Sequence, residues 1–186
     1  MSNIPKQVLL FSGKRKSGKD FIAENICNTL GAQNCEIIRI SHPIKAHWAA
    51  QKSLSLEELL GDTQYKEKYR KEMIEWSEQV RNNDYGYFCK EACKSISRPI
   101  CIVSDVRRKT DIKWFKDEFG DKVKTIRIVS DNRIREARGW KFVEGVDDVA
   151  SECDLDDYKL WDLVVVNNND VETEELIKPI LNQVKG

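Results

Sequence analysis

The chain has 186 residues, 40% of them apolar and 33% charged, a composition typical of one soluble globular domain. Lysine plus arginine and aspartate plus glutamate both number 31, so the formal net charge of zero argues against broad binding to nucleic acids or membranes. No apolar run approaches the roughly 18 residues that indicate a membrane span. Any cationic function must therefore be local.

The first predicted element is a buried strand at residues 8–12, which a basic, glycine-bracketed loop and a helix at 18–30 follow. The two glycines let the backbone curl so that successive N–H groups point into one nest. The helix start adds unpaired donors and partial positive charge, and the loop lysine reaches the outer phosphates. The pattern predicts a site for a nucleoside triphosphate, ATP, formed by Gly13, Lys14, Arg15, Lys16, Ser17, Gly18, Lys19 and Asp20.

Asp20 departs from this loop pattern, which has Ser or Thr after the lysine to hold Mg²⁺ through a hydroxyl. The alternative interpretation is a flexible basic turn between a strand and a helix. Lys14, Arg15 and Lys16 argue against it, because together with Lys19 they make four cations in one turn, which repel one another unless an anion is bound there.

Further strands are predicted at 36–40, 100–104, 123–129 and 163–167. The continuous apolar runs 100–103 and 163–166 are typical of strands covered on both faces, as in a parallel sheet between helices. Helical spacing predicts helices at 64–80 and 171–184, the second capped by Asn169 or Asp170. Strands alternating with helices indicate one doubly wound α/β domain.

Residues 43–96 contain no convincing strand, which predicts an all-helical insertion at a strand edge, where substrate pockets are commonly built. Its long helix carries Lys66, Lys68, Arg70, Lys71 and Arg81, and periodicity does not separate solvated charges from functional ones. The apolar stripe on that helix is read as core packing.

Asp105, Arg107 and Arg108 follow the strand at 100–104, at the sheet edge where ligands bind in open α/β folds. The Asp105 carboxylate either holds Mg²⁺, directly or through water, or caps the helix that follows it.

Arginines 133, 135 and 138 follow the strand at 123–129 and precede the acidic, loop-like tract 139–157. This tract is either an ordinary solvated loop or a mobile lid, and the lid would bring positive charge onto a transferring phosphoryl group. The lid is taken as residues 133–157.

The six cysteines lack zinc spacing and only two histidines are present, so free thiols in a reducing cytosol are expected. The N-terminal residues 1–7 do not read as a signal peptide, and residues 182–186 do not read as a prenylation or peroxisomal signal. We expect a monomeric cytosolic protein.

Taken together, these motifs resemble the animal phosphomevalonate kinases, over essentially the whole chain. That family also carries aspartate after the loop lysine. The residues that carry the resemblance are 9–21, 65–67, 70–71, 73–74, 76, 103–105, 107–108, 111–112, 114–115, 138–140, 145–148 and 151–153.

The resemblance implies a three-layer fold like that of nucleoside monophosphate kinases, with a five-stranded parallel sheet. It implies transfer of the γ-phosphoryl group of ATP, with Mg²⁺, to (R)-5-phosphomevalonate. The nucleotide would be served by the loop residues with Arg138 and Asn168, and catalysis by Lys19, Asp20, Arg15, Arg107 and Arg108. The acceptor would be bound by Lys66, Arg81, Arg107, Arg108, Arg135 and Asn167, and the metal by Asp20 and Asp105.

Two other functions remain open at this point. A deoxynucleoside monophosphate kinase would share the fold but would need a base-stacking pocket, for which Tyr65, Tyr69 or Trp76 are candidates. A nucleotide-binding scaffold without catalysis is disfavoured by the presence of Lys19 and Asp20.

Overall fold

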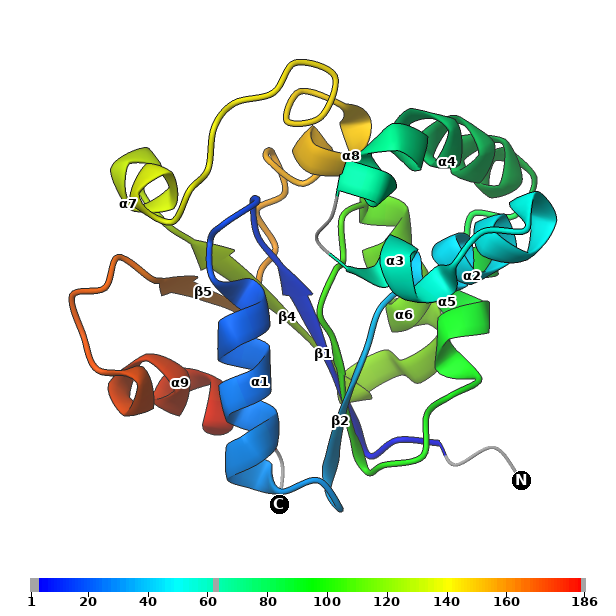
Figure 1. Cartoon of the computed structure of the whole chain (residues 1–186). Coiled ribbons are helices and arrows are strands. Elements are labelled where there is room, and N and C mark those ends of the chain that lie inside the picture. The colour runs from blue at the N-terminus through cyan, green and yellow to red at the C-terminus, as the bar shows by residue number, and fades with distance from the viewer. Residues whose placement is uncertain (1–3, 62–63, 185–186) are drawn as a thin grey trace.

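The computed structural model describes residues 4–61 and 64–184, without the side chains of residues 64–67 (Figure 1). Its sheet is parallel throughout, with strand order β2-β3-β1-β4-β5, which confirms the predicted five-stranded parallel α/β fold. Every strand therefore points its carboxyl end to the same edge. The strands are β1 (Gln7–Ser12), β2 (Cys35–Ile38), β3 (Ile100–Val103), β4 (Val123–Val129) and β5 (Leu163–Val166).

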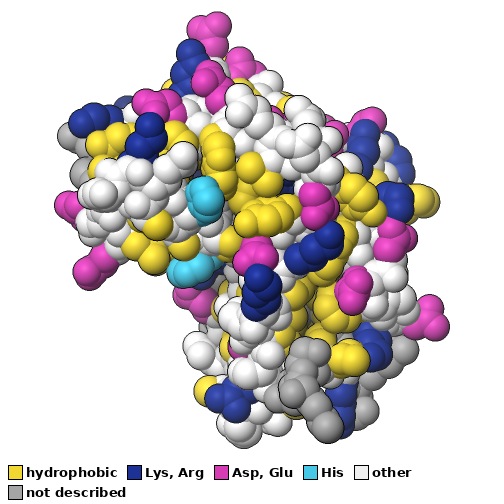
Figure 2. Space-filling view, turned by 90° about the vertical axis from the view of Figure 1, so that its right-hand side faces the viewer, with side chains coloured by type: hydrophobic (Ala, Val, Ile, Leu, Met, Phe, Trp, Pro, Cys, Tyr) yellow, Lys and Arg dark blue, Asp and Glu magenta, His cyan; other side chains and the backbone are white. Residues whose placement is uncertain are grey.

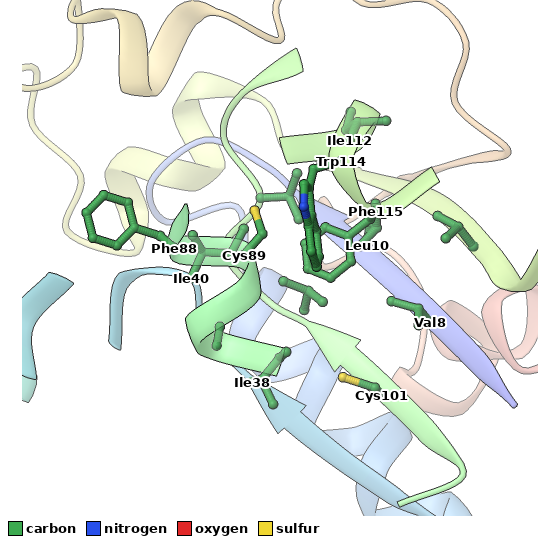
Figure 3. Close-up of a cluster of buried hydrophobic side chains, with 14 of the residues drawn as sticks. Val8, Leu10, Ile38, Ile40, Phe88, Cys89, Cys101, Ile112, Trp114 and Phe115 are labelled. Carbon is green, nitrogen blue, oxygen red and sulfur yellow. The ribbon is translucent and has the colours of Figure 1, made fainter. Parts of the chain in front are cut away.

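Two hydrophobic cores lie on opposite faces of this sheet, because successive side chains of a strand point to opposite faces. Leu9 and Phe11 of β1 pack with α1 (Lys19–Leu30) and α9 (Thr173–Leu181). Val8 and Leu10 pack on the other face with α5 (Tyr87–Cys93) and α6 (Lys109–Phe119), as Figure 3 shows. The covered sheet is the rigid base on which the loops at its carboxyl edge are mounted.

The segment between β2 and β3 is helical, with α2 (Ser41–Lys52), α3 (Leu56–Leu60) and α4 (Gln64–Asn83) ahead of α5. It has a small core of its own, built from Trp48, Leu59 and Met73. A short turn, η1 (Gly120–Lys122), leads into β4, and α7 (Asn132–Ala137) and α8 (Ala150–Cys153) lie between β4 and β5. In Figure 1 these two helices and the α2–α4 helices lie at the end of the molecule to which the strands point.

The α4 stripe faces this packing, as predicted. Met73 is buried, and Trp76 packs edge-on against Phe88 and stacks on His47 with ring centroids 4.5 Å apart. The side chain of Tyr65 lies outside the described residues.

Two predicted strands differ from the structure. β2 ends at Ile38 rather than residue 40, because the backbone N–H groups of Ile40 and Ser41 donate to the Asp105 carboxylate instead of continuing the sheet. The apolar run of β5 predicts a strand covered on both faces, but β5 is an edge strand, and its Val164 and Val166 are each 51% exposed.

The last helix begins later than predicted, at Thr173, and neither predicted residue caps it. Its N-cap is Glu172, without a side-chain hydrogen bond. Asn169 has a left-handed backbone with φ of 61°, and its amide oxygen accepts a hydrogen bond from Arg138. The Asn169 side chain is thus bonded to Arg138, and the N-cap position of α9 is taken by Glu172.

All six cysteines are free. Within residues 4–61 and 64–184, no helix combines the length and apolar character needed to cross a bilayer. Figure 2 shows basic and acidic side chains interspersed on the face that it displays, in keeping with the zero formal net charge.

Candidate active site

The loop between β1 and α1 has the backbone conformation of an anion nest. Lys16 and Gly18 have positive φ angles of 61° and 86°, and the N–H of Ser17 closes a turn on the carbonyl of Lys14. A Cβ atom at Gly13 would lie 2.6 Å from Ser17 Oγ and 2.7 Å from the carbonyl oxygen of Ile128. Only glycine fits there, so the loop is packed against β4 at its first residue.

Three distant side chains hold the loop by its carbonyl groups. Arg135 Nε donates to the carbonyl of Arg15 at 2.8 Å, and Arg138 Nη1 donates to that of Lys16 at 3.2 Å. Asn167 Nδ2 donates to the carbonyl of Ser17 at 3.0 Å. The loop carbonyls are thereby satisfied outside the nest, which favours a conformation in which N–H groups face a bound anion.

The sequence analysis assigned these three residues to ligand binding. In the structure Arg135, Arg138 and Asn167 do not line the pocket described below, and the Arg135 guanidinium lies 3.9 Å from the ring centre of Trp140. Asn168 is also engaged elsewhere, since its amide makes two hydrogen bonds of 2.9 Å to Asp131. The contacts of all four residues with ligands therefore stay predictions. In the structure, Arg135, Arg138 and Asn167 bond to the loop, and Asn168 bonds to Asp131 beside the end of β5.

A pocket of about 1130 Å³ opens at the carboxyl ends of β1, β2 and β3. Its basic lining comes from separate parts of the chain. Cations of the β1–α1 loop meet cations of the turn after β3 and of helix α4. The pocket-lining members of these groups are Arg15, Lys16, Lys19, Arg70, Arg81, Arg107 and Arg108. The fold thus brings two predicted groups, the loop cations and the β3 arginines, to one cavity.

Lys19 is a largely buried residue of this basic pocket lining. Its side chain is only 11% exposed, and its Nζ lies 3.3 Å from Asp20 Oδ2. Burial, followed by the nearby guanidinium of Arg107, lowers the pKa of Lys19. Burial also lowers the pKa of Arg107. Both shifts mean that positive charge is held here at a cost, which a bound phosphate would relieve.

Arg81 comes from α4 and Arg108 from the turn after β3, and each has an acidic partner. Arg81 Nη1 lies 2.7 Å from Asp111 Oδ1, and Arg108 pairs with Glu78 of α4. Burial opposes the charge of Arg81, but the Asp111 carboxylate outweighs it and raises the pKa of Arg81. Sequence reasoning did not identify either carboxylate as a partner of these arginines. Asp111 lies three residues after Arg108, in the first turn of α6, a position that favours carboxylates.

Asp105 caps a helix, but a different one from the helix considered in the sequence. Its Oδ1 accepts from the N–H of Ile40 at 2.7 Å and its Oδ2 from that of Ser41 at 3.0 Å, at the start of α2. The helix after Asp105 is capped by Asp111 instead. Each Asp105 oxygen retains a free lone pair, and the residue lines the pocket, so metal binding stays a prediction.

The acidic segment, residues 139–157, supplies carboxylates to the cations of the site. Asp147 lies 3.1 Å from Arg15, Glu152 pairs with Arg107, and Asp156 lies 2.6 Å from Lys14 Nζ. Asp156 also contacts Arg127 at 3.3 Å. Lys14 is turned away from the pocket by these bonds, whereas Lys16 lines it and is exposed. The side chain of Lys66 lies outside the described residues.

Comparison with known proteins agrees with this geometry. The sequence matches the family described as phosphomevalonate kinase over residues 11–121. It is 50% identical over 176 residues to the phosphomevalonate kinase of Drosophila melanogaster, covering 91% of this chain and 93% of that protein.

Two solved structures share the fold at low identity. TT1252 from Thermus thermophilus has a TM-score of 0.56 at 15% identity, covering 98% of this chain and 100% of that one. A gluconokinase from Sinorhizobium meliloti 1021 has a TM-score of 0.52 at 10% identity, covering 95% of this chain and 90% of that one.

Proposed function

This chain belongs to the phosphomevalonate kinase family, and we infer that it transfers the γ-phosphoryl group of ATP to the phosphate of (R)-5-phosphomevalonate, giving (R)-5-diphosphomevalonate and ADP. This is a step of the mevalonate pathway to isoprenoids and sterols. One structural observation supports the inference most directly: the loop cations and the arginines after β3 line the same pocket. One pocket can therefore hold the phosphate groups of both substrates side by side.

The two sides of the pocket suggest a division of work. On the donor side, the nest and the ammonium of Lys19 take the phosphates of ATP, with Arg15 beside them. On the acceptor side, Arg81, Arg107 and Arg108 take the phosphate or carboxylate of phosphomevalonate. Phosphoryl transfer depends mainly on positioning and on neutralising charge. No general base is required, because the second pKa of a phosphate monoester is about 6 and the acceptor is already largely dianionic.

The acidic segment serves in this scheme as the end of a lid spanning residues 133–157, over a helical substrate domain at 43–96. Asp147, Glu152 and Asp156 hold the loop cations and Arg107 through ion pairs. Phosphates of the substrates would replace these carboxylates, since both are anions that arginine and lysine bind. The exchange would couple ligand binding to movement of the segment.

The carboxylates of Asp20 and Asp105 line the pocket and are suitable oxygen ligands for Mg²⁺. In the part of the chain that the structure describes, no cluster of three or more His, Cys, Asp or Glu forms a metal cage. That agrees with Mg²⁺, which proteins usually hold through one or two carboxylates plus substrate phosphates. The bound ion would neutralise charge on the β- and γ-phosphates. The charges of Asp20 and Asp105 both raise the pKa of Lys19, against the larger lowering by burial and Arg107, which supports a position for both carboxylates close to the phosphates that Lys19 would bind.

Asp20→Asn tests the metal assignment. The variant should raise the Mg²⁺ concentration that half-saturates turnover by about tenfold, because it removes a charged oxygen ligand. The measurement is a Mg²⁺ titration at saturating ATP, with Glu24→Gln, an exposed carboxylate of the same helix, as the matched control. An unaltered titration would mean that Asp20 instead orients Lys19, its neighbour at 3.3 Å.

The activity itself is tested by mixing purified protein with ATP and Mg²⁺ and measuring ADP release. Phosphomevalonate should support turnover, and a panel of deoxynucleoside monophosphates should not. Turnover with the nucleotides alone would overturn the inference. A protein that binds ATP but turns over neither class would be a scaffold rather than an enzyme.

We also place the protein in the cytosol as a monomer. The six free cysteines are what a reducing compartment maintains.

A further inference from the structure

Asp111, in the first turn of α6, is the most enclosed carboxylate of the pocket wall. Its side chain is 1% exposed although the residue lines the pocket. A buried carboxylate is costly unless charged partners and hydrogen bonds surround it. The partners of Asp111 all come from residues at or beside the acceptor side of the pocket.

The two oxygens of this carboxylate have separate partners. Oδ1 accepts from Arg81 Nη1 at 2.7 Å, and from the thiol of Cys89 at 3.7 Å. Oδ2 accepts from the backbone N–H groups of Arg107 at 3.2 Å and Arg108 at 3.1 Å. One side chain therefore touches all three pocket arginines that we assign to the acceptor.

The ion pair with Asp111 orients the guanidinium of Arg81. Its guanidinium lies 5.4 Å from the ring centre of Phe88, which holds one face, and its end is tied to Asp111. Its side chain is only 11% exposed, so little water is present to replace a lost partner. The same carboxylate fixes the turn after β3, from which the side chains of Arg107 and Arg108 leave the backbone.

We propose that Asp111 is a positioning residue for the acceptor phosphate, orienting Arg81 through an ion pair and Arg107 and Arg108 through their backbone. The proposal rests on the proposed function, because it assumes that these arginines bind phosphomevalonate. It predicts a defect specific to one substrate. The nucleotide loop makes none of the Asp111 contacts given above, so ATP binding should be spared.

The first test is Asp111→Asn, which retains the shape of the side chain and removes its charge. The KM for phosphomevalonate should rise about tenfold to a hundredfold, as expected for loss of a charged hydrogen bond. The dissociation constant of a non-hydrolysable ATP analogue, measured by calorimetry, should change less than twofold.

The matched control is Asp162→Asn. Asp162 also accepts a backbone N–H, that of Thr125 at 2.7 Å, and lies 3.6 Å from Lys124, but it does not line the pocket. The Asp162→Asn variant should leave the KM for phosphomevalonate and the dissociation constant of the ATP analogue unchanged, even if its melting temperature falls. Equal losses for ATP and phosphomevalonate in Asp111→Asn would identify a general folding defect and overturn the proposal.

A double-mutant cycle keeps the test decisive if the single variant is unstable. Arg81→Gln and the pair Arg81→Gln/Asp111→Asn are compared, because the pair leaves no buried charge without a partner. If Asp111 acts through Arg81, adding Asp111→Asn to Arg81→Gln should change the KM for phosphomevalonate less than it does alone. Full additivity, or an unchanged KM in Asp111→Asn, would overturn the proposal. Wild-type turnover of phosphomevalonate in the same assay would show that the proposed function still stands.

Discussion

Replacing Lys19 by methionine should lower kcat by about 10²–10³, or roughly 3–4 kcal/mol, with a smaller effect on the KM for ATP. Lys19 follows the nest at the start of α1, and burial together with Arg107 already lowers its pKa. An ammonium held in that environment stabilises the charge that develops on transferring phosphoryl oxygens more than it stabilises ground-state ATP. Methionine has a similar length and apolar stem, so the loss isolates the charge.

Single-turnover measurements of ADP release would check this effect against two controls. Lys178→Met, on the exposed side of α9, should behave as wild type. Lys19→Arg should recover part of the loss, because it restores a cation of different shape. A Lys19→Met enzyme with an unchanged kcat would remove this residue from the mechanism.

Replacing Gly13 by alanine should weaken ATP binding about tenfold to a hundredfold, or about 1.4–2.8 kcal/mol. The added Cβ would lie 2.6 Å from Ser17 Oγ and 2.7 Å from the carbonyl oxygen of Ile128. Because the second contact is with the backbone of β4, a side-chain rotation cannot relieve it. The loop itself must shift, and the N–H groups of the nest would lose their common direction.

Calorimetric titration with an ATP analogue would measure this loss. Gly120→Ala is the matched control, because Gly120 has a positive φ of 56° at the end of α6 and nothing lies within 4 Å of its Cβ position. It should cost about 1–3 kcal/mol of stability, because alanine is strained at this backbone conformation, without affecting ATP binding. Normal ATP affinity in Gly13→Ala would show that the nest tolerates the shift.

Local sequence patterns were enough to predict the sheet and the glycine-bracketed loop after β1. The continuous apolar run of β1 and the glycines on either side of the basic residues are features of adjacent residues. Burial on both faces of a strand and a left-handed turn each leave a signature within a few positions. The same local rule failed at β5, because an edge strand and a central strand are equally apolar until the strand order is known.

The directions of the polar side chains required the folded chain. Arg135 and Arg15 are separated by 120 residues, and Asn167 and Ser17 by 150, yet these pairs hold the nucleotide loop. Asp111 and Arg81, 30 residues apart, meet only because α4 returns to the start of α6. A sequence identifies an arginine as charged, but its long side chain can extend in many directions. Tertiary packing and desolvation determine which partner it contacts. Residue type and short-range periodicity thus predicted a phosphate-binding loop, and the family resemblance implied the kinase chemistry. Long-range packing determined which cations line the pocket and which hold the loop in place.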